Sequence, residues 1–299
     1  MNAQTSRLVL GTVQLGMNYG LNNQSGQPDI KKAEEIIHAA YAGGVTCFDT
    51  AQAYGNSESV LGLCLNKLGY SDKVKVISKP SPDFQGKPGD LSTALAYSLS
   101  ELGIKKLEAF LLHREEHLNL LSLEQIKEGQ VLLQNGLLKG FGVSVYTPSV
   151  ALTALKHPLI SALQIPASVF DHRFNQAGVF NIAKSLNKRI YIRSAFLQGV
   201  VCMDLDKIPP FLSSLKPALE AYQKLCVECG LSRTGLALSW LLQVYPNAYV
   251  LFGAETPEQV EENLASLAST PLPVDVVERI AKLFPEQGEN ILNPALWQR

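Results

Sequence analysis

The sequence lacks the features that membrane, secreted and nucleic-acid-binding proteins need. None of its 299 residues fall in a run that approaches the roughly 18 uninterrupted apolar residues of a spanning helix, and residues 1–7 are polar where a secretory signal would be apolar. Lys and Arg number 26 against 27 Asp and Glu, a net charge of -1, so no positive field attracts nucleic acid or anionic lipid. We therefore expect a cytoplasmic protein with no nucleic-acid and no membrane partner.

Cysteine is also scarce. The five cysteines are an odd and sparse set, which is typical of a reducing compartment rather than a disulfide framework. Cys226 and Cys229 form a CxxC pair inside a helix-like run, residues 219–231, with no second pair and no His at ligand spacing. We therefore expect ordinary helix packing there and no metal site.

The chain consists largely of apolar segments that alternate in period. Hydrophobic residues make up 46% of the chain, and short β-branched runs alternate with longer stretches of helical period, the pattern of a parallel sheet with crossover helices. The predicted strands are residues 8–12, 45–50, 74–79, 109–113, 140–144, 162–165, 189–194 and 248–253. The predicted helices are residues 30–41, 60–68, 91–102, 123–133, 150–155, 179–186 and 215–229.

Eight strands with helices between them predict an α/β fold, a closed (β/α)8 TIM barrel, as a single domain over residues 1–299. A doubly wound sheet is the alternative, but no G-x-G-x-x-G follows the opening strand. The glycines of residues 11–16 have P-loop-like spacing, yet Met17 and Asn18 stand where Lys and Ser or Thr are needed. No linker divides the chain; longer loops are expected at residues 20–28, 80–90 and 200–210.

Polar side chains end four consecutive predicted strands: Asp49, Lys79, His113 and Ser144, with Tyr54 five residues past Asp49. The carboxyl ends of barrel strands meet at one rim, where such folds carry catalysis. An ammonium beside a tyrosine lowers the pKa of the phenol, so Lys79 could tune Tyr54 as a proton donor. Asp49 would keep Lys79 charged, and His113 would orient a substrate oxygen.

Each of these residues also has a purely structural interpretation. Lys79 and Asp49 could form a structural ion pair, His113 could be a core histidine, and Tyr54 could simply pack. Their order on consecutive strands at one rim favours a joint role in polarising a carbonyl group.

The same residues belong to a longer set of motifs that resembles the aldo-keto reductase family over nearly the whole chain. The motifs are Leu10-Gly11-Thr12, residues 48–58 with Asp49 and Tyr54, Ser78-Lys79-Pro80, Leu111-Leu112-His113, residues 140–144, Leu163-Gln164, residues 237–240 and residues 253–263. The resemblance implies a TIM barrel that binds a nicotinamide cofactor and reversibly reduces an aldehyde or ketone. It implies Tyr54 as general acid, Lys79 and Asp49 as its tuning pair, and His113 as substrate orienter.

The resemblance also implies where the cofactor binds. Ser144 and Gln164 match the carboxamide-binding pair, although Val145 stands where the family often has Asn, and Arg193 replaces the usual aromatic stack on the nicotinamide. Ser194 and residues 197–200 match the pyrophosphate region. The implied cofactor-binding residues are Gly11, Thr12, Ser144, Gln164, Arg193, Ser194, Phe196, Gly199, Gly253, Glu255, Gln259, Glu262 and Asn263.

The choice between NADPH and NADH stays open at this point. Family habit favours NADPH, yet residues 253–263 contain no cation to hold its extra phosphate. Thr256, Pro257 and Gln259 predict a helix start there, while Glu255 and Glu258 would repel a phosphate. A cation from elsewhere, such as Arg233, is the alternative.

The leading interpretation is an NAD(P)H-dependent reductase of a small-molecule carbonyl substrate. A cofactor-binding regulatory or sensor subunit and a phosphate-binding barrel isomerase are the alternatives. The sequence names neither the substrate nor the oligomeric state. The loops expected to form the substrate pocket contain Gln14, Tyr146, Phe170, Arg193 and Phe196. Whether Arg193 stacks on the nicotinamide or binds an anionic substrate is open too.

Overall fold

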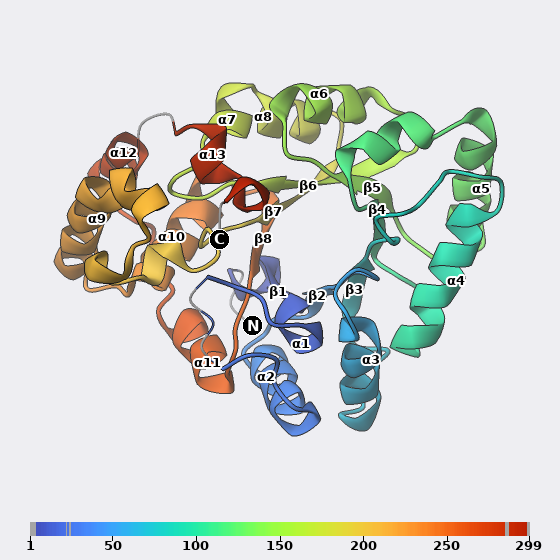
Figure 1. Ribbon diagram of the computed structural model, residues 1–299, viewed down its shortest axis with the longest axis horizontal. Helices are drawn as coiled ribbons and strands as arrows, with labels where there is room; N and C mark the ends of the chain where they lie inside the picture. The colour runs from blue at the N-terminus through green and yellow to red at the C-terminus, as the bar shows by residue number, and fades with distance from the viewer. Residues whose placement is uncertain (1–3, 22, 24, 285–286, 298–299) are drawn as a thin grey trace.

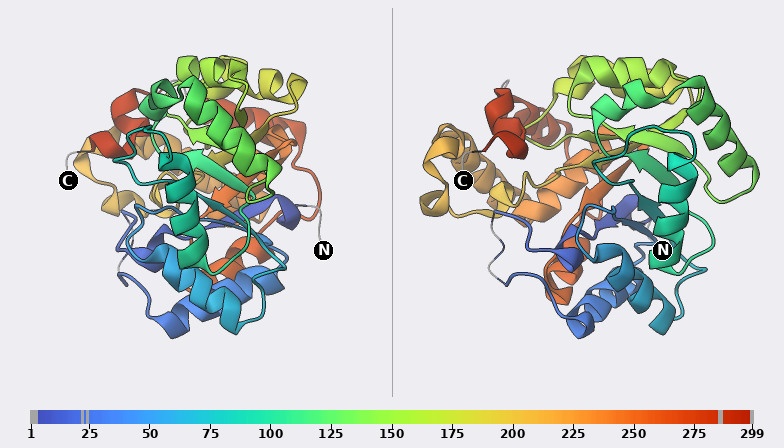
Figure 2. Two further views of the ribbon diagram at one scale, coloured as in Figure 1. Left: turned by 90° about the vertical axis from the view of Figure 1, so that its right-hand side faces the viewer. Right: turned by 45° about the vertical axis from the view of Figure 1, so that its right-hand side comes forward.

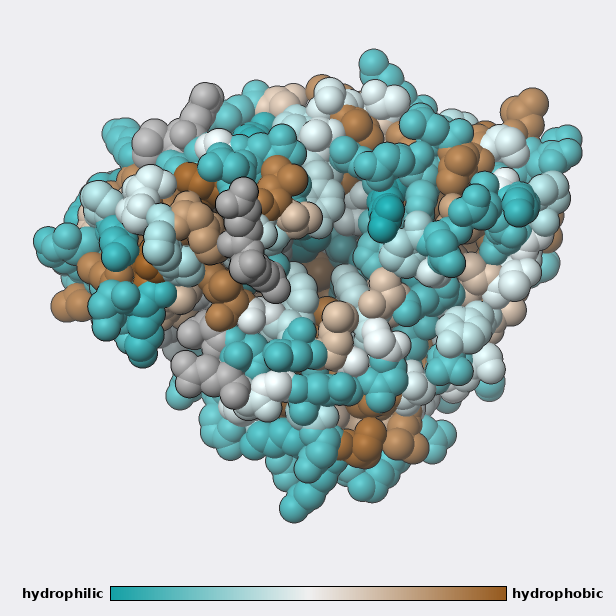
Figure 3. Space-filling model, viewed as in Figure 1, coloured by the Kyte–Doolittle hydropathy of each residue, from teal (hydrophilic) through white to brown (hydrophobic). Residues whose placement is uncertain are grey.

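Eight parallel strands close into a barrel, with β1 to β8 in chain order and β8 paired back to β1. The computed structural model describes residues 4–21, 23, 25–284 and 287–297; the ends of the predicted domain 1–299 and two positions of the predicted loop 20–28 lie outside these ranges. The predicted (β/α)8 TIM barrel is confirmed. Figures 1 and 2 show the helices wrapped around the strands, and Figure 3 shows the surface hollowed near its middle.

All eight predicted strands are present, with ends that differ by a few residues. The strands are β1 (Leu8–Gly11), β2 (Cys47–Asp49), β3 (Lys75–Ser78), β4 (Ala109–Leu112), β5 (Phe141–Ser144), β6 (Ile160–Pro166), β7 (Arg189–Arg193) and β8 (Ala248–Phe252).

The seven predicted helices are also present. They are α2 (Ile30–Ala42), α3 (Ser57–Lys67), α4 (Asp90–Leu102), α5 (Leu123–Gln134), α6 (Pro148–Lys156), α8 (Val179–Ser185) and α9 (Lys216–Cys229). Side-chain caps begin several helices; the Asp29 carboxylate, for example, accepts the Lys32 amide at the start of α2.

Six helices that lie outside the simple strand–helix repeat were not predicted from the sequence periodicity. They are α1 (Val13–Gly16), α7 (Arg173–Gln176), α10 (Arg233–Val244), α11 (Pro257–Ala265), α12 (Val274–Leu283) and α13 (Glu289–Leu292); only the start of α11 was predicted, from its cap. Short 3-10 turns are η1 (Thr5–Arg7), η2 (Glu115–Leu120), η3 (Val200–Cys202), η4 (Leu205–Lys207), η5 (Pro210–Leu215) and η6 (Pro294–Leu296). Helix α10 is buried on all sides from Gly235 to Leu242, so it has no amphipathic period to detect.

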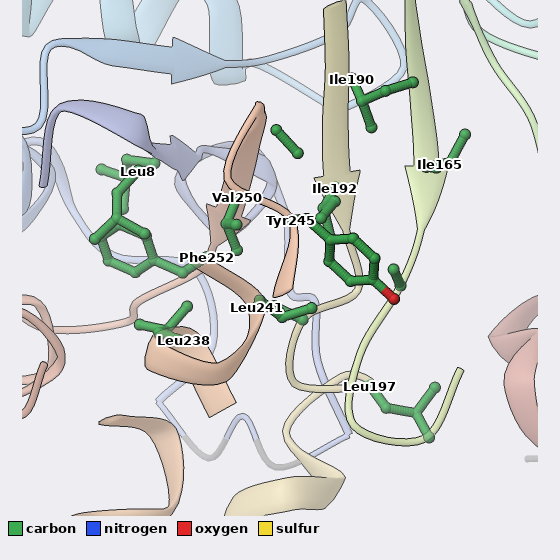
Figure 4. Packing of buried hydrophobic residues seen from close by; sticks show 14 of the residues in the cluster. Leu8, Ile165, Ile190, Ile192, Leu197, Leu238, Leu241, Tyr245, Val250 and Phe252 are labelled. Atoms are coloured by element: carbon green, nitrogen blue, oxygen red, sulfur yellow. The ribbon is translucent and has the colours of Figure 1, made fainter. Parts of the chain in front are cut away.

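Alternate residues of the strands pack into two separate cores. Leu8 and Phe252 point outward and pack toward Leu238 of α10, as Figure 4 shows. The intervening residues form a smaller cluster inside the barrel, composed of Val9, Cys47, Ile77, Ala109, Leu111, Ala162, Tyr191 and Leu251. Because the side-chain period of a strand is two, the next inward positions lie at the carboxyl mouth of the barrel. Those positions are Gly11, Asp49, Lys79, His113, Gln164, Arg193 and Gly253.

Within the described residues, no single helix is long and apolar enough to cross a membrane. Residues 210–229 and 233–244 together are long and apolar enough to span a membrane, but the two segments are bent by 86° relative to each other.

Gly142 offers a test of the packing inside the barrel. A Cβ at Gly142 would approach the Ala162 carbonyl oxygen at 2.3 Å and Leu111 Cδ2 at 2.5 Å, whereas a Cβ at Gly11 would meet only the Phe252 carbonyl oxygen at 3.6 Å. We expect Gly142→Ala to lower the free energy of unfolding by about 1–3 kcal/mol and Gly11→Ala, the matched control, by a small fraction of that. Equal urea midpoints for the two variants would contradict this packing.

Candidate active site at the carboxyl ends of the strands

One cavity of about 440 Å³ lies at the carboxyl ends of the strands. Its volume is in the range of small-molecule sites. All four predicted catalytic residues line it, as do all thirteen cofactor-binding residues that the resemblance implied: Gly11, Thr12, Ser144, Gln164, Arg193, Ser194, Phe196, Gly199, Gly253, Glu255, Gln259, Glu262 and Asn263. The residues that the sequence placed apart along the chain are therefore brought together.

Some lining residues were missed, and one expected pocket residue is absent from the lining. Tyr19, Cys202 and Thr234 also line the cavity; they lie on a loop, in the 3-10 turn η3 and in the first turn of α10, where no period marks an inward position. Phe170, expected in a substrate loop, is instead buried against Phe284, with ring centroids 4.5 Å apart.

Lys79 and Asp49 form an ion pair that is almost fully removed from water. Their side chains are 1% and 4% exposed. Lys79 Nζ donates to Asp49 Oδ1 at 2.9 Å, to Asp49 Oδ2 at 2.7 Å and to the Thr50 carbonyl oxygen at 2.8 Å, which uses all three ammonium hydrogens. Burial lowers the pKa of Lys79, and the Asp49 charge opposes that shift.

Gln164 supports the pair from the opposite side of the barrel. Its Nε2 donates to Asp49 Oδ1 at 2.8 Å. The resemblance implied that Gln164 contacts the cofactor carboxamide. In this structure the amide nitrogen of Gln164 is hydrogen-bonded to Asp49. This bond gives the buried Asp49 carboxylate a further hydrogen-bond donor besides Lys79.

Tyr54 lies over the ion pair, but its pKa does not move as the sequence predicted. Lys79 Nζ is 5.1 Å from the centroid of the Tyr54 ring. Burial, with the Asp49 charge adding to it, raises the pKa of Tyr54 above its ordinary value, while Arg193 lowers it. Lys79 alone would lower this pKa, but burial and the adjacent Asp49 charge outweigh it, so the net shift is upward. Tyr54 therefore holds its proton at neutral pH.

Glycines fix the loop that carries Tyr54. A Cβ at Gly16 would lie 1.8 Å from the Tyr54 carbonyl oxygen, and a Cβ at Gly55 would lie 2.2 Å from the Gly16 carbonyl oxygen. The backbones of residues 16 and 54–55 are therefore in direct contact. Ser57 Oγ adds a hydrogen bond of 2.7 Å to the Thr12 carbonyl oxygen, which joins this loop to the end of β1.

His113 is a neutral ring beside Tyr54. The two rings meet edge to face with centroids 5.7 Å apart. Burial, with the Lys79 charge adding to it, lowers the pKa of His113 to about 3. Nδ1 of His113 is buried without a hydrogen-bond partner among the described residues, so it is a polar atom that a bound ligand could satisfy.

The opposite end of the cavity is lined by acidic and neutral residues. Helix α11 begins as predicted: Thr256 Oγ1 accepts the Gln259 amide at 3.2 Å, and Gln259 Oε1 accepts the Glu255 amide at 2.7 Å. Arg233, the alternative phosphate clamp, donates instead to the carbonyl oxygens of Cys202 and Met203 at 2.8 and 2.9 Å. Arg233 is therefore used to hold a loop.

The cavity wall has two features that suit a polar ligand. Leu197, Gln198 and Gly199 all have positive φ, so the chain turns sharply beside Ser194. A Cβ at Gly253 would lie 2.5 Å from Gln14 Nε2, and Gln14 Oε1 is a buried acceptor without a partner among the described residues. A ligand hydroxyl or amide would satisfy that acceptor.

The described part of the chain contains no candidate metal centre. Within residues 4–21, 23, 25–284 and 287–297, no group of three or more His, Cys, Asp or Glu is placed to hold a metal ion. Cys226 and Cys229 are free thiols on α9, and burial raises the pKa of each.

Comparison with known proteins identifies the family. The model of the aldo/keto reductase family matches residues 7–284, so the chain belongs to that family. Aldo-keto reductase str7 of Strobilurus tenacellus is 26% identical over 280 residues, which cover 84% of this chain and 81% of the relative. An NADH-specific methylglyoxal reductase of Escherichia coli is 24% identical over 296 residues, covering 88% of this chain and 90% of the relative.

A solved structure has the same fold. An aldo/keto reductase of Klebsiella pneumoniae, in complex with NADP and acetate, has a TM-score of 0.70 at 19% identity and covers 96% of this chain and 94% of that chain. Reduction of small carbonyl compounds with a nicotinamide cofactor is the general chemistry of the family. The chain is thus an oxidoreductase, and the barrel-isomerase alternative is set aside.

Asp49→Asn tests the buried ion pair. We expect it to lower the free energy of unfolding by about 3–5 kcal/mol near pH 7, because it leaves the buried Lys79 charge unpaired. Burial favours the neutral amine in the folded state, so the loss should shrink as the pH rises and Lys79 deprotonates. Glu220→Gln, which breaks an exposed pair with Lys224, should leave the free energy of unfolding nearly unchanged. Equal losses for the two variants in urea unfolding would contradict the account.

Proposed function

We propose that the chain reduces an aldehyde or ketone to an alcohol by hydride transfer from a nicotinamide cofactor, with Tyr54 as the general acid. The observation that carries the proposal is the convergence of Tyr54, His113 and the Lys79–Asp49 pair on one cavity. The bound cofactor would supply a hydride to the carbonyl carbon. The protein's part is to hold the carbonyl oxygen and deliver a proton to it.

The proton step follows from the geometry around Tyr54. Because its pKa is raised, the Tyr54 hydroxyl is protonated when substrate arrives and can donate a hydrogen bond to the carbonyl oxygen. Neutral His113 lies against the Tyr54 ring, and its N–H group can donate a hydrogen bond to the same oxygen. As the oxygen becomes an alkoxide, the Tyr54 proton moves to it, and the Lys79 ammonium stabilises the resulting phenolate.

A regulatory subunit without turnover would not need this arrangement. A sensor must bind the cofactor, but it gains nothing from a proton donor set over a buried ion pair. The alternative of the sequence analysis is therefore the less economical interpretation of the site.

Tyr54→Phe tests the proton donor. The variant keeps the ring that packs on His113 and loses only the hydroxyl, so cofactor should bind with unchanged affinity while kcat falls about 10²- to 10⁴-fold. Tyr41→Phe is the control, because Tyr41 stacks on Tyr70 away from the cavity. Steady-state kinetics with a panel of aldehydes and fluorescence titration of the cofactor give both quantities. A Tyr54→Phe enzyme that turns over within about threefold of the wild type would exclude Tyr54 as the acid.

We also propose that the preference of the enzyme for NADPH over NADH is weak or reversed. The described residues that line the cavity include two cations, Lys79 and Arg193, and both belong to its catalytic end. Glu255 and Glu262 line the other end. The extra phosphate of NADPH would face carboxylates, and a helix N-terminus contributes only about 0.3–1 kcal/mol to hold it.

Glu255→Arg tests the cofactor preference. A charge-assisted bond contributes about 1.5–3 kcal/mol, so we expect the ratio of kcat/KM values to shift toward NADPH by about tenfold or more. Glu258→Arg is the matched control, because Glu258 lies on the first turn of α11 but outside the cavity lining, 3.8 Å from Lys32. A wild type that prefers NADPH by about a hundredfold, together with no shift in Glu255→Arg, would disprove the proposal.

A further inference from the structure

Arg193 carries the unbalanced charge of the cavity. The other cation of the described lining, Lys79, is neutralised by Asp49. Arg193 comes from the end of β7, and no carboxylate oxygen of the described residues lies within 4.0 Å of its guanidinium nitrogens. Glu115, the first residue of η2, is already hydrogen-bonded to backbone groups. Its Oε2 accepts the Tyr146 amide at 2.7 Å and the Thr147 amide at 3.1 Å.

The hydrogen-bonding capacity of Arg193 is also mostly unused. A guanidinium has five N–H donors. Among described residues, Nη1 donates to Ser194 Oγ at 3.3 Å and Nη2 to the Val145 carbonyl oxygen at 3.4 Å; both bonds are long and both acceptors are neutral. Donors that lose water when a ligand enters need acceptors from that ligand. A flat ring stacked on the guanidinium would leave them unsatisfied, whereas an oxyanion would satisfy them.

A fixed neighbour already holds the plane of the guanidinium. The Arg193 carbon Cζ lies 3.8 Å from the centroid of the Tyr146 ring. The Glu115 bonds to the Tyr146 and Thr147 amides anchor the backbone that carries this ring. One face of the guanidinium is therefore covered by protein, and its orientation is set before a ligand binds. Preorganised donors of this kind bind a carboxylate or phosphate with little loss of side-chain entropy.

Arg193 also lies close to the proton donor. Its charge acts on Tyr54, where it lowers the pKa against the effect of burial, and on Lys79. Arg193 ends β7 two residues beyond Tyr191, the partner of Gln164, and it lines the same cavity as Asp49, Lys79 and Tyr54. An anion held by Arg193 would thus lie beside the carbonyl group that Tyr54 protonates.

We propose that Arg193 binds an anionic group of the substrate, so that the preferred substrates are short carbonyl compounds carrying a carboxylate or a phosphate near the carbonyl carbon. This rests on the proposed reductase function. For a 2-oxo acid, a hydride from the reduced nicotinamide adds to the carbonyl carbon and the Tyr54 proton adds to the oxygen. The product is the 2-hydroxy acid with its carboxylate unchanged; the nicotinamide, which would supply both electrons, would be left oxidised, and a proton from solution restores the Tyr54 hydroxyl.

Matched substrates separate charge from shape. Pyruvate and methylglyoxal have the same three-carbon 2-oxo skeleton and differ in a carboxylate against an aldehyde. Glyceraldehyde 3-phosphate and glyceraldehyde form the corresponding phosphate pair. The ratio of kcat/KM for the anionic to the neutral member is measured in the wild type, Arg193→Met, Arg193→Lys and the control Arg279→Met, which alters an exposed pair with Glu228.

We expect Arg193→Met to lower that ratio by about 10- to 100-fold for at least one pair, whatever its effect on kcat/KM for the neutral member alone. Arg193→Lys should retain part of the preference, because it keeps the charge and loses the planar fork. The pair that responds identifies carboxylate or phosphate as the anion. Unchanged ratios in Arg193→Met for both pairs would overturn the proposal.

Binding measurements keep this proposal separate from the reductase proposal. Titration of oxamate, a non-reacting carboxylate, into the protein by calorimetry should give a dissociation constant that rises about tenfold or more in Arg193→Met, with and without cofactor. Oxamate binding that depends on Arg193 would stand even if no carbonyl compound were reduced. If Arg193→Met instead weakens NADH and leaves oxamate affinity and both ratios unchanged, Arg193 serves the cofactor and the proposal fails.

Discussion

The buried ion pair between Lys79 and Asp49 is the interaction on which the cavity is built. Removing two charges from water costs several kcal/mol per ion before their attraction is counted, so such a pair persists only when its remaining hydrogen-bonding groups are satisfied. Both partners meet this condition. The Thr50 carbonyl oxygen accepts the third hydrogen bond of the Lys79 ammonium, and Gln164, from across the barrel, donates to the Asp49 carboxylate. The same strand ends are fixed by Thr12, whose hydroxyl donates to the Asp49 carbonyl oxygen at 2.9 Å.

Because the pair is neutral as a unit, the electrostatics of the cavity are set by other groups. His113 is uncharged and Tyr54 is protonated, which leaves Arg193 as the source of positive potential at the catalytic end. Glu255 and Glu262 give the far end the opposite sign. An anionic substrate at the catalytic end and a cofactor with free ribose hydroxyls at the far end suit this polarity. The substrate and cofactor proposals both follow from this one distribution of charge.

The sequence predicted the barrel and the positions of the site because both depend on periods that a single chain reveals. Period two along eight strands sets which residues face the mouth, and Asp49, Lys79 and His113 stand at strand ends. Helix α10 was not predicted, because it is buried on all sides and its sequence therefore has no apolar stripe of helical period. Phe170 was placed wrongly because its burial against Phe284, 114 positions later in the chain, is a tertiary contact.

The electrostatics of the site could not be predicted in the same way. The effect of Lys79 on Tyr54 depends on how far Asp49 cancels its charge and on how deeply the ring is buried, and both are properties of the folded chain. The stack of Arg193 on Tyr146 and the Gln164 contact with Asp49 join residues 47 and 115 positions apart. Sequence pattern names these residues but does not say which of them pair.

The most direct test of the central claim is to follow the transferred atom. The enzyme is incubated with NADH carrying deuterium at the transferable C4 position and with a carbonyl substrate, and the alcohol is analysed by mass spectrometry and NMR. The account predicts one deuterium on the carbinol carbon of the wild-type product. It also predicts that Tyr54→Phe binds the labelled cofactor but forms product far more slowly. Product whose carbinol hydrogen comes from water, or cofactor that binds and is never oxidised by any carbonyl compound, would contradict it.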